Sequence, residues 1–226
     1  MNADLLVVGA HPDDLELHFG GIAARAAMDG LIVVGLDLTR GERASRGTPE
    51  VRAREAEASA RVLGLAERVN ADLPDTAVTS TDRDHLVAVV TLIRRVRPRW
   101  VLAPHPEDPH PDHREGGRLL ERALYFAHVG GFSAHGTGIV VDVSAAFARK
   151  KEALACYASQ FAPGAGEATR LNRPGFLDAV EARARRLGEL VGVTHGEGLV
   201  HAGALAWTAP LGGLFGEHGF AGGPTA

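Results

Sequence analysis

LLVVGAHPDDLE, residues 5–16, is the stretch that decides the fold class of this 226-residue chain. Its first five residues form a short apolar run that ends in glycine, which is typical of a buried strand. The polar sequence HPDD follows at once, and an alanine-rich helical pattern then runs from Leu17 to Asp29, just before Gly30. A buried strand, a polar turn and a helix in this order indicate the first half of a βαβ unit.

The same alternation continues along the chain. Strands are expected over residues 5–9, 31–38, 69–73, 100–103 and 139–143, and helices over residues 17–29, 48–63, 84–97, 112–128, 144–159 and 175–191. This order predicts a single α/β domain, a Rossmann-like fold with a mostly parallel sheet and helices on both faces. We expect the domain to occupy residues 1–211 and a Gly-rich tail to occupy residues 212–226.

Composition narrows the class of protein. The chain has 24 basic and 28 acidic residues, and its net charge of −4 disfavours binding to a nucleic-acid backbone. Its only cysteine, Cys156, allows no internal disulfide. The first residues lack the basic and apolar stretches of a signal peptide, and no apolar run reaches the length of a membrane span. We therefore expect a cytoplasmic protein that binds neither membrane nor nucleic acid.

Two polar loops follow strands that should be neighbours. AHPDDLE, residues 10–16, comes directly after the first strand, and HPEDPHPDH, residues 105–113, comes directly after the fourth. In a doubly wound sheet of strand order 3-2-1-4, the first and fourth strands flank the switch point where ligands bind. The two loops should therefore face each other across one crevice.

The residue types in these loops favour a catalytic metal site. His11, Asp14 and His113 would supply two nitrogens and one oxygen, and a catalytic zinc takes three protein ligands plus water. Asp13 would then be free to take a proton from the bound water, whose pKa zinc lowers to about 7. Fe²⁺ suits the same donors.

The remaining loop residues suggest how an amide could be cleaved. His110 would lie on the opposite side of the substrate, where it could stabilise an oxyanion or protonate a leaving amine. Asp112 is expected to hold the His110 ring in one tautomer. Each loop taken alone could instead be a capped turn or a solvated surface segment. A phosphate-binding loop is disfavoured, because the glycine pattern is absent and the two carboxylates would repel phosphate.

AHPDDLE and HPDH, residues 10–16 and 110–113, resemble the two signature motifs of the PIG-L/LmbE-like zinc N-deacetylases. LDLTRGE, RGTPEVRAREAEASARVLGL, RPRWVLAP and YASQF extend the resemblance to about residue 161, with a weaker similarity at GVTHGEGLV. Among subfamilies, the chain is most similar to the bacillithiol-pathway enzymes that deacetylate N-acetylglucosaminyl-malate.

This resemblance implies specific roles. It implies one zinc ion per subunit on His11, Asp14 and His113, with Asp13 as general base and His110, backed by Asp112, acting on the transition state and leaving group. It also implies a small-molecule substrate and a homo-oligomer, often a hexamer.

Two further residues are candidates for substrate binding. By resemblance, Arg52 binds the substrate and would face the malate carboxylates; alternatively, it pairs with Glu55 on a solvated helix face. His195 lies where relatives carry an aromatic residue, so it either touches the sugar or lies on the surface. The segment over residues 128–138 is short and Gly-rich for the family, so one wall of the substrate pocket should differ.

The leading hypothesis is a zinc hydrolase that removes acetyl from N-acetylglucosaminyl-malate. A second hypothesis keeps this chemistry but changes the substrate to N-acetylglucosaminyl-inositol, chitobiose or another N-acyl compound. A third is a metal-binding or sugar-binding module without catalysis. A pure binding site needs neither Asp13 nor His110, so their presence favours an enzyme.

Overall fold

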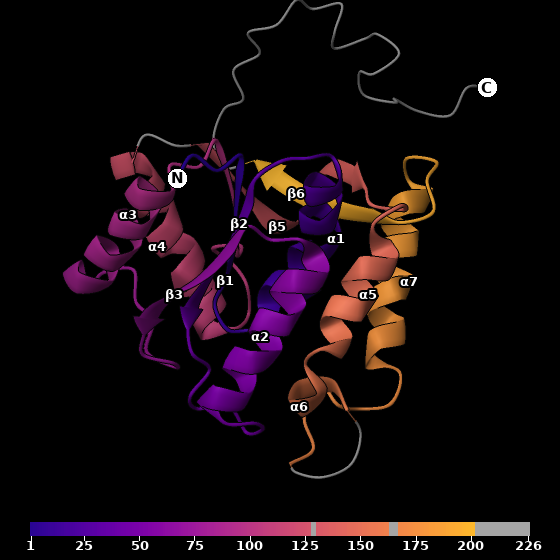
Figure 1. The fold of residues 1–226 in the computed structure, drawn as a ribbon, viewed down its shortest axis with the longest axis horizontal. Helices are drawn as coiled ribbons and strands as arrows, with labels where there is room; N and C mark the ends of the chain where they lie inside the picture. Colours follow the sequence, from indigo (N-terminus) through magenta and orange to yellow (C-terminus); the bar gives the residue numbers. More distant parts are fainter. Residues whose placement is uncertain (128–129, 163–166, 202–226) are drawn as a thin grey trace, which may run out of the picture.

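The computed structural model describes residues 1–127, 130–162 and 167–201 (Figure 1). Within these residues one sheet has the strand order β3-β2-β1-β4-β5-β6. The strands are β1 (Leu5–Gly9), β2 (Val33–Thr39), β3 (Glu67–Leu73), β4 (Trp100–Ala103), β5 (Gly130–Asp142) and β6 (Gly196–His201). The first five strands are parallel, and β6 runs antiparallel to β5. The expected α/β class and the expected neighbours β1 and β4 are confirmed.

Helices cover both faces of this sheet (Figure 1). They are α1 (Asp14–Met28), α2 (Pro49–Leu63), α3 (Arg83–Val96), α4 (Pro111–Ala127), α5 (Phe147–Ala155), α6 (Ala158–Phe161) and α7 (Phe176–Glu189). Helices α3 and α4 contribute to one core, and α1, α2, α5 and α7 contribute to the other. None of the described helices is long and apolar enough to cross a bilayer.

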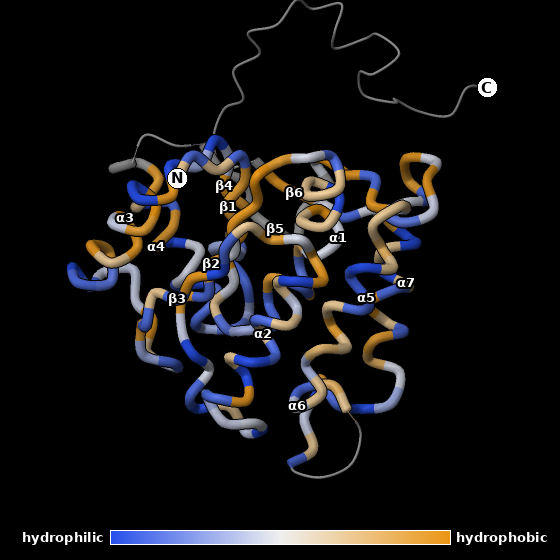
Figure 2. Tube along the Cα trace, in the orientation of Figure 1, coloured by the Kyte–Doolittle hydropathy of each residue, from blue (hydrophilic) through white to orange (hydrophobic). Residues whose placement is uncertain are grey.

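Strand β1 shows why its sequence is apolar throughout. Leu5 and Val7 point into the core beneath α1, whereas Leu6 and Val8 point into the core beneath α3 and α4. Successive side chains of a strand face opposite sides, so a strand covered on both faces needs apolar residues at every position. Figure 2 shows this hydrophobic centre and the polar periphery.

The expected helix over residues 48–63 is also confirmed. Thr48 caps α2 by accepting a hydrogen bond from the Val51 N–H to its side-chain oxygen, 3.3 Å away, and Pro49 occupies the first turn. The helix ends at Gly64, whose positive φ of 78° is the left-handed geometry that favours glycine.

The C-terminal half differs from the expectation. Strand β5 begins at Gly130 rather than Ile139, and pairing with both β4 and β6 supports its Gly-rich first part. The expected helix over residues 144–159 is interrupted at Tyr157, which has a non-helical ψ of 59° and is fully buried. The tail expected from residue 212, and the domain boundary before it, lie outside the described residues.

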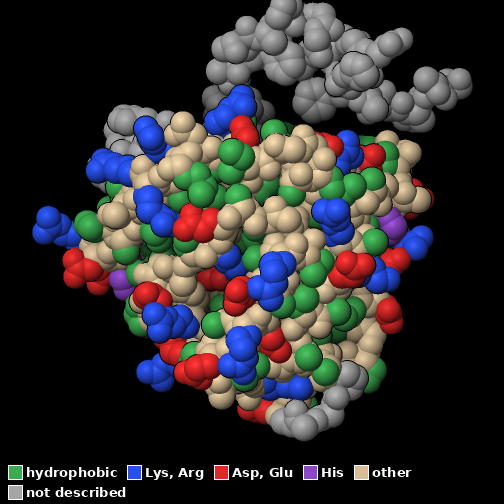
Figure 3. All heavy atoms as spheres, viewed as in Figure 1, with side chains coloured by type: hydrophobic (Ala, Val, Ile, Leu, Met, Phe, Trp, Pro, Cys, Tyr) green, Lys and Arg blue, Asp and Glu red, His purple; other side chains and the backbone are tan. Residues whose placement is uncertain are grey.

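On the face shown in Figure 3, charged side chains are spread without a dominant sign. Figure 3 shows acidic and basic side chains interspersed over the face in view. Proteins that track a phosphate backbone instead gather basic side chains on one face. The side chains coloured in this view form no such basic face.

Candidate metal centre and active site

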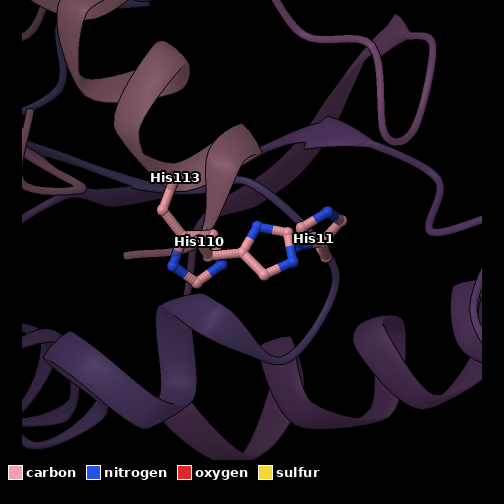
Figure 4. Close-up of side chains that lie close together, drawn as sticks. All are labelled: His11, His110 and His113. Atoms are coloured by element: carbon pink, nitrogen blue, oxygen red, sulfur yellow. The ribbon is translucent and has the colours of Figure 1, made fainter. Parts of the chain in front are cut away.

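The two polar loops meet at the carboxyl ends of β1 and β4. The loop after β1 carries His11, the loop after β4 carries His110, and the first turn of α4 carries His113, so that the three rings converge (Figure 4). The ring centroids of His11 and His113 are 5.5 Å apart, and those of His110 and His113 are 4.5 Å apart. A cleft of about 1110 Å³ opens over these side chains. The structure thus brings together segments about one hundred residues apart, as the expected switch point requires.

Asp14 lies between the two expected histidine ligands. Its Oδ2 atom is 3.1 Å from Nδ1 of His11 and 3.1 Å from Nε2 of His113. Asp14 opens α1, and its Oδ2 also accepts the backbone N–H of His11 at 2.8 Å. Two imidazole nitrogens that each contact the same carboxylate oxygen form a donor set that suits zinc or ferrous iron. The residues present therefore fit a catalytic divalent metal.

The charges at this point also favour a cation. Burial lowers the pKa of His113, but the neighbouring Asp14 carboxylate outweighs it and raises that pKa to about 10. Burial raises the pKa of Asp14, and the two histidines more than reverse this, holding it well below the usual range. The buried carboxylate is thus kept ionised by protons on its neighbours, which a metal ion can replace.

The surroundings of Asp13 differ from those of the adjacent Asp14. It is buried, its Oδ1 lies 3.3 Å from Nη2 of Arg52, and its Oδ2 has no hydrogen-bond partner among the described residues. Burial raises the pKa of Asp13 to about 8, against the opposing effect of Arg52. Its φ of 114° is uncommon for a residue other than glycine, and such strain concentrates at functional sites.

Arg52 holds the backbone of the HPDD turn through hydrogen bonds of its guanidinium. Its buried guanidinium donates hydrogen bonds to the carbonyl oxygen of Pro12 and, at 3.4 Å, to that of Gly41. The alternative of a solvated pair with Glu55 is wrong, since Glu55 instead accepts a hydrogen bond from the backbone N–H of Ser159 at 2.8 Å. The backbone at position 41 can come this close because glycine has no Cβ; a Cβ there would collide with the guanidinium.

The expectation that the Asp112 carboxylate holds His110 is wrong. That carboxylate lies 3.0 Å from Nε2 of His11 and accepts the backbone N–H groups of Thr76 and Val78. The reason is positional: Asp112 is in the first turn of α4 with its side chain facing inward, 1% exposed, whereas His110 precedes the helix. Asp112 therefore orients a candidate metal ligand instead.

The backbone of Asp112 fixes the His110 ring. Its N–H donates to Nδ1 of His110 at 3.2 Å, so a neutral ring carries its proton on Nε2. Burial, followed by the charges of His113 and His11, lowers the pKa of His110 and so favours this neutral form. His110 lines the cleft and is exposed to it, so its Nε2–H can act as a donor there.

His195 does not lie in the cleft. Its ring stacks on Phe147 with centroids 4.1 Å apart, and its Nε2 is 3.7 Å from a carboxylate oxygen of Glu181. His195 comes directly before β6, and its backbone forms hydrogen bonds with the Val143 N–H and the Ser144 side chain. The ring therefore packs between α5, α7 and the sheet rather than among the residues that line the cleft, and the sugar contact stays a prediction.

Sequence reasoning missed Asp75, which follows β3 at the same edge of the sheet. Its Oδ1 is 3.2 Å from Nε2 of His11, its Oδ2 accepts the backbone N–H of Arg43, and it lines the cleft. Despite the opposing effect of burial, its contact with His11 lowers the pKa of Asp75 to about 2. The signal was available, since a carboxylate just after a parallel strand belongs to the ligand-binding edge.

Two buried ionic groups tie α1 to the rest of the fold. Glu16 accepts hydrogen bonds from Arg68, Ser59 and Tyr157. Further along α1, Lys150 and Glu197 contact the helix backbone at Leu17, Gly21 and Ile22. The two side chains also pair with each other, Nζ of Lys150 lying 2.7 Å from Oε1 of Glu197. Helix α1, whose first turn carries Asp14, is thereby held by contacts from β3, α2, β6 and the segment around α5.

Comparison with known proteins identifies the family. Residues 6–124 match the PIG-L family model, described as GlcNAc-PI de-N-acetylase. The diacetylchitobiose deacetylase of Thermococcus kodakarensis is 32% identical over 190 residues, which is 70% of this chain and 70% of that protein. The 1D-myo-inositol 2-acetamido-2-deoxy-alpha-D-glucopyranoside deacetylase of Rhodococcus opacus is 29% identical over 78% of this chain and 71% of its own length.

A solved structure agrees with these relatives. The crystal structure of a conserved protein from Thermus thermophilus superposes with a TM-score of 0.80 and 33% identity, covering 91% of this chain and 97% of that one. The family match spans β1 to α4 and so includes both polar loops. The chain belongs to the PIG-L family of deacetylases, and it is an enzyme of the hydrolase class.

Proposed function

We propose that this enzyme removes the acetyl group from an N-acetylglucosamine conjugate, using one zinc ion per subunit held by His11, Asp14 and His113. The observation that carries the proposal is the position of Asp14 Oδ2, 3.1 Å from a nitrogen of each histidine. The buried, unpartnered Oδ2 of Asp13 beside it supports hydrolysis over simple binding, because a purely binding site needs no such base.

The roles of the side chains follow from their contacts. A metal at this point would polarise the acyl carbonyl and lower the pKa of a water molecule. Asp13 would accept a proton from the attacking water molecule as the oxygen of that water adds to the acyl carbon, and Arg52 holds the Asp13 turn in place. His110, through Nε2–H, donates to the developing oxyanion or to the departing nitrogen. The C–N bond breaks, giving acetate and a free amine.

For the rest of the substrate we propose an acidic aglycone, with malate as the leading candidate. The innermost charges of the cleft are already paired: Arg52 with Asp13, and Lys150 with Glu197. The lining also carries Arg43, Arg46, Arg170 and Arg183. Its carboxylates Asp75 and Asp108 contact His11 and His113, which leaves Glu107 as the acidic neighbour of these arginines. More arginines than carboxylates in this set support recognition of an acidic aglycone.

The test compares three substrates that share the acetamide. Free amine is measured for zinc-loaded enzyme with N-acetylglucosaminyl-malate, N-acetylglucosaminyl-inositol and diacetylchitobiose. We expect the malate conjugate to be preferred by about tenfold or more in kcat/KM, which corresponds to about 1.4 kcal/mol. A preference for either neutral conjugate would overturn the acidic aglycone while leaving the deacetylase proposal intact.

We also propose a cytoplasmic homo-oligomer, with a hexamer as the first candidate. The sole cysteine supports a reducing compartment. Apolar side chains at the end of α1 and at the amino ends of β2 and β4 are exposed by about two-fifths or more, namely Met28, Leu31, Ile32 and Trp100, and this supports a contact between copies. Light scattering coupled to gel filtration tests the oligomer, and a monomer at micromolar concentration would contradict it.

A further inference from the structure

A histidine outside the signature motifs lies beside the proposed metal ligands. His18 is on α1, one helical turn after Asp14, and it lines the same cleft. Residues four apart on a helix share a face, so the side chains of Asp14 and His18 are directed to the same side. Ligand atoms of Asp14, His18 and His113 all lie within 4.8 Å of one another.

The position of His18 is comparable with that of the expected ligand His11. The His18 ring centroid is 5.7 Å from that of His113, while the His11 centroid is 5.5 Å from it. His18 approaches edge-on at 89°, from the helix side, whereas His11 approaches from the loop after β1. The two histidines therefore reach the Asp14–His113 pair from different directions.

The backbone that carries His18 is unusually well fixed. Nζ of Lys150 donates to the carbonyl oxygen of Leu17 at 2.9 Å. The Glu197 carboxylate accepts the backbone N–H groups of Gly21 and Ile22, at 2.9 and 2.8 Å. The backbone of α1 around His18 is thus held from both sides by a buried ion pair, so His18 can approach or leave the metal site only by rotation of its side chain.

We propose that His18 is a fourth protein ligand of the metal ion in the substrate-free enzyme. The inference rests on the proposed metal site at His11, Asp14 and His113. Three protein ligands leave zinc an open position for water, whereas four close a tetrahedral shell. His18 thereby tightens retention of the ion between turnovers, and it must leave the ion when water and substrate bind.

Metal affinity and spectroscopy test this directly. Zinc affinity is measured by chelator competition for wild-type enzyme and for His18→Gln and His18→Ala, two changes that a helix tolerates. Cobalt replaces zinc for absorption spectra, because its visible bands report the number and type of ligands. We expect zinc to bind about tenfold more weakly or worse in both variants, and the cobalt bands to change.

The matched control is His105→Asn. His105 lines the same cleft but belongs to none of the ligand groups formed by the described residues, and its Nδ1 accepts only a local bond from the Glu107 N–H. This variant should keep the wild-type zinc affinity and cobalt spectrum.

Two results would overturn the role of His18 without touching the proposed function. One is unchanged affinity and spectrum in both His18 variants of an enzyme that binds one zinc and releases amine. The other is two zinc ions per wild-type chain, with one lost in the variants, which would make His18 a ligand of a separate ion. Wild-type enzyme that binds no zinc at all would overturn the metal site itself.

Discussion

The neighbouring residues Asp13 and Asp14 have the same side chain but different contacts, and the roles proposed for them differ accordingly. Asp14 contacts nitrogens of two histidines, and its carboxylate stays ionised. Asp13 faces one arginine and leaves an oxygen unpartnered in a buried setting. The sequence predicted Asp14 as the ligand and Asp13 as the base, and the different surroundings of the two carboxylates, together with the positive φ of 114° at Asp13, support this division.

Replacement of Asp13 separates catalysis from metal binding. Asp13→Asn keeps the shape of the side chain but cannot accept a proton from water, so we expect turnover to fall by about 10²–10⁴-fold. Zinc content, measured by elemental analysis, should stay at one ion per chain. A variant that kept near wild-type turnover would show that another group is the base.

Replacement of Asp112 tests whether its carboxylate acts through His11 or through His110. The Asp112 carboxylate touches His11 rather than His110, so Asp112→Asn should weaken zinc binding by about 10–100-fold. Chelator competition measures this, with the exposed Asp178→Asn as a control that should have no effect. A loss of turnover with unchanged zinc affinity would instead restore the expected role on His110.

Some helices and strands could be predicted from local sequence signals, whereas others depend on the neighbours against which they pack. Strand β4 and helix α2 match the sequence prediction because an apolar run and a Thr-Pro start are strong local signals. Strand β6 and the start of β5 were missed, since their Gly-rich sequences become strands by pairing with neighbours. The break at Tyr157 was missed as well, because a buried hydroxyl bond to Glu16 favours it and helical periodicity does not reveal it.

The ion pair between α5 and β6 is expected to be important for stability. Lys150→Met leaves the buried Glu197 carboxylate without its partner, which should lower the free energy of unfolding by about 3–5 kcal/mol. The adjacent Lys151 makes an exposed pair with Glu181, so Lys151→Met should cost only about 0–1 kcal/mol. Urea denaturation measures both. Equal costs for the two variants would contradict the structural role of the buried pair.

At the scale of the whole molecule, the parallel sheet explains why the site was predictable. Loops after neighbouring parallel strands must meet at one edge, and this brought His11 and His113 together from sequence reasoning alone. The same rule could have found Asp75 after β3. Side chains whose direction depends on packing, such as His195 against Phe147, could not be placed in this way.

Removal of the metal tests whether the fold exists without it. Two apolar cores flank the sheet and do not involve the metal ligands, so chelated protein should remain folded. Free zinc at about 100 times its Kd should stabilise the fold by about 2.7 kcal/mol, which corresponds to an increase in Tm of about 5–10 °C. Differential scanning calorimetry measures this. Unfolding upon chelation, or an unchanged Tm with zinc, would contradict the account.

The central claim is metal-dependent hydrolysis of an N-acetyl group at the joined HPDD and HPDH loops. The most direct measurement is free amine released from N-acetylglucosaminyl-malate by chelated enzyme, before and after one equivalent of zinc is restored. We predict no release without zinc, recovery with it, and little recovery for Asp13→Asn treated identically. Equal release with and without zinc would contradict the claim, as would zinc-loaded enzyme that released no amine from this conjugate or from its inositol and chitobiose counterparts.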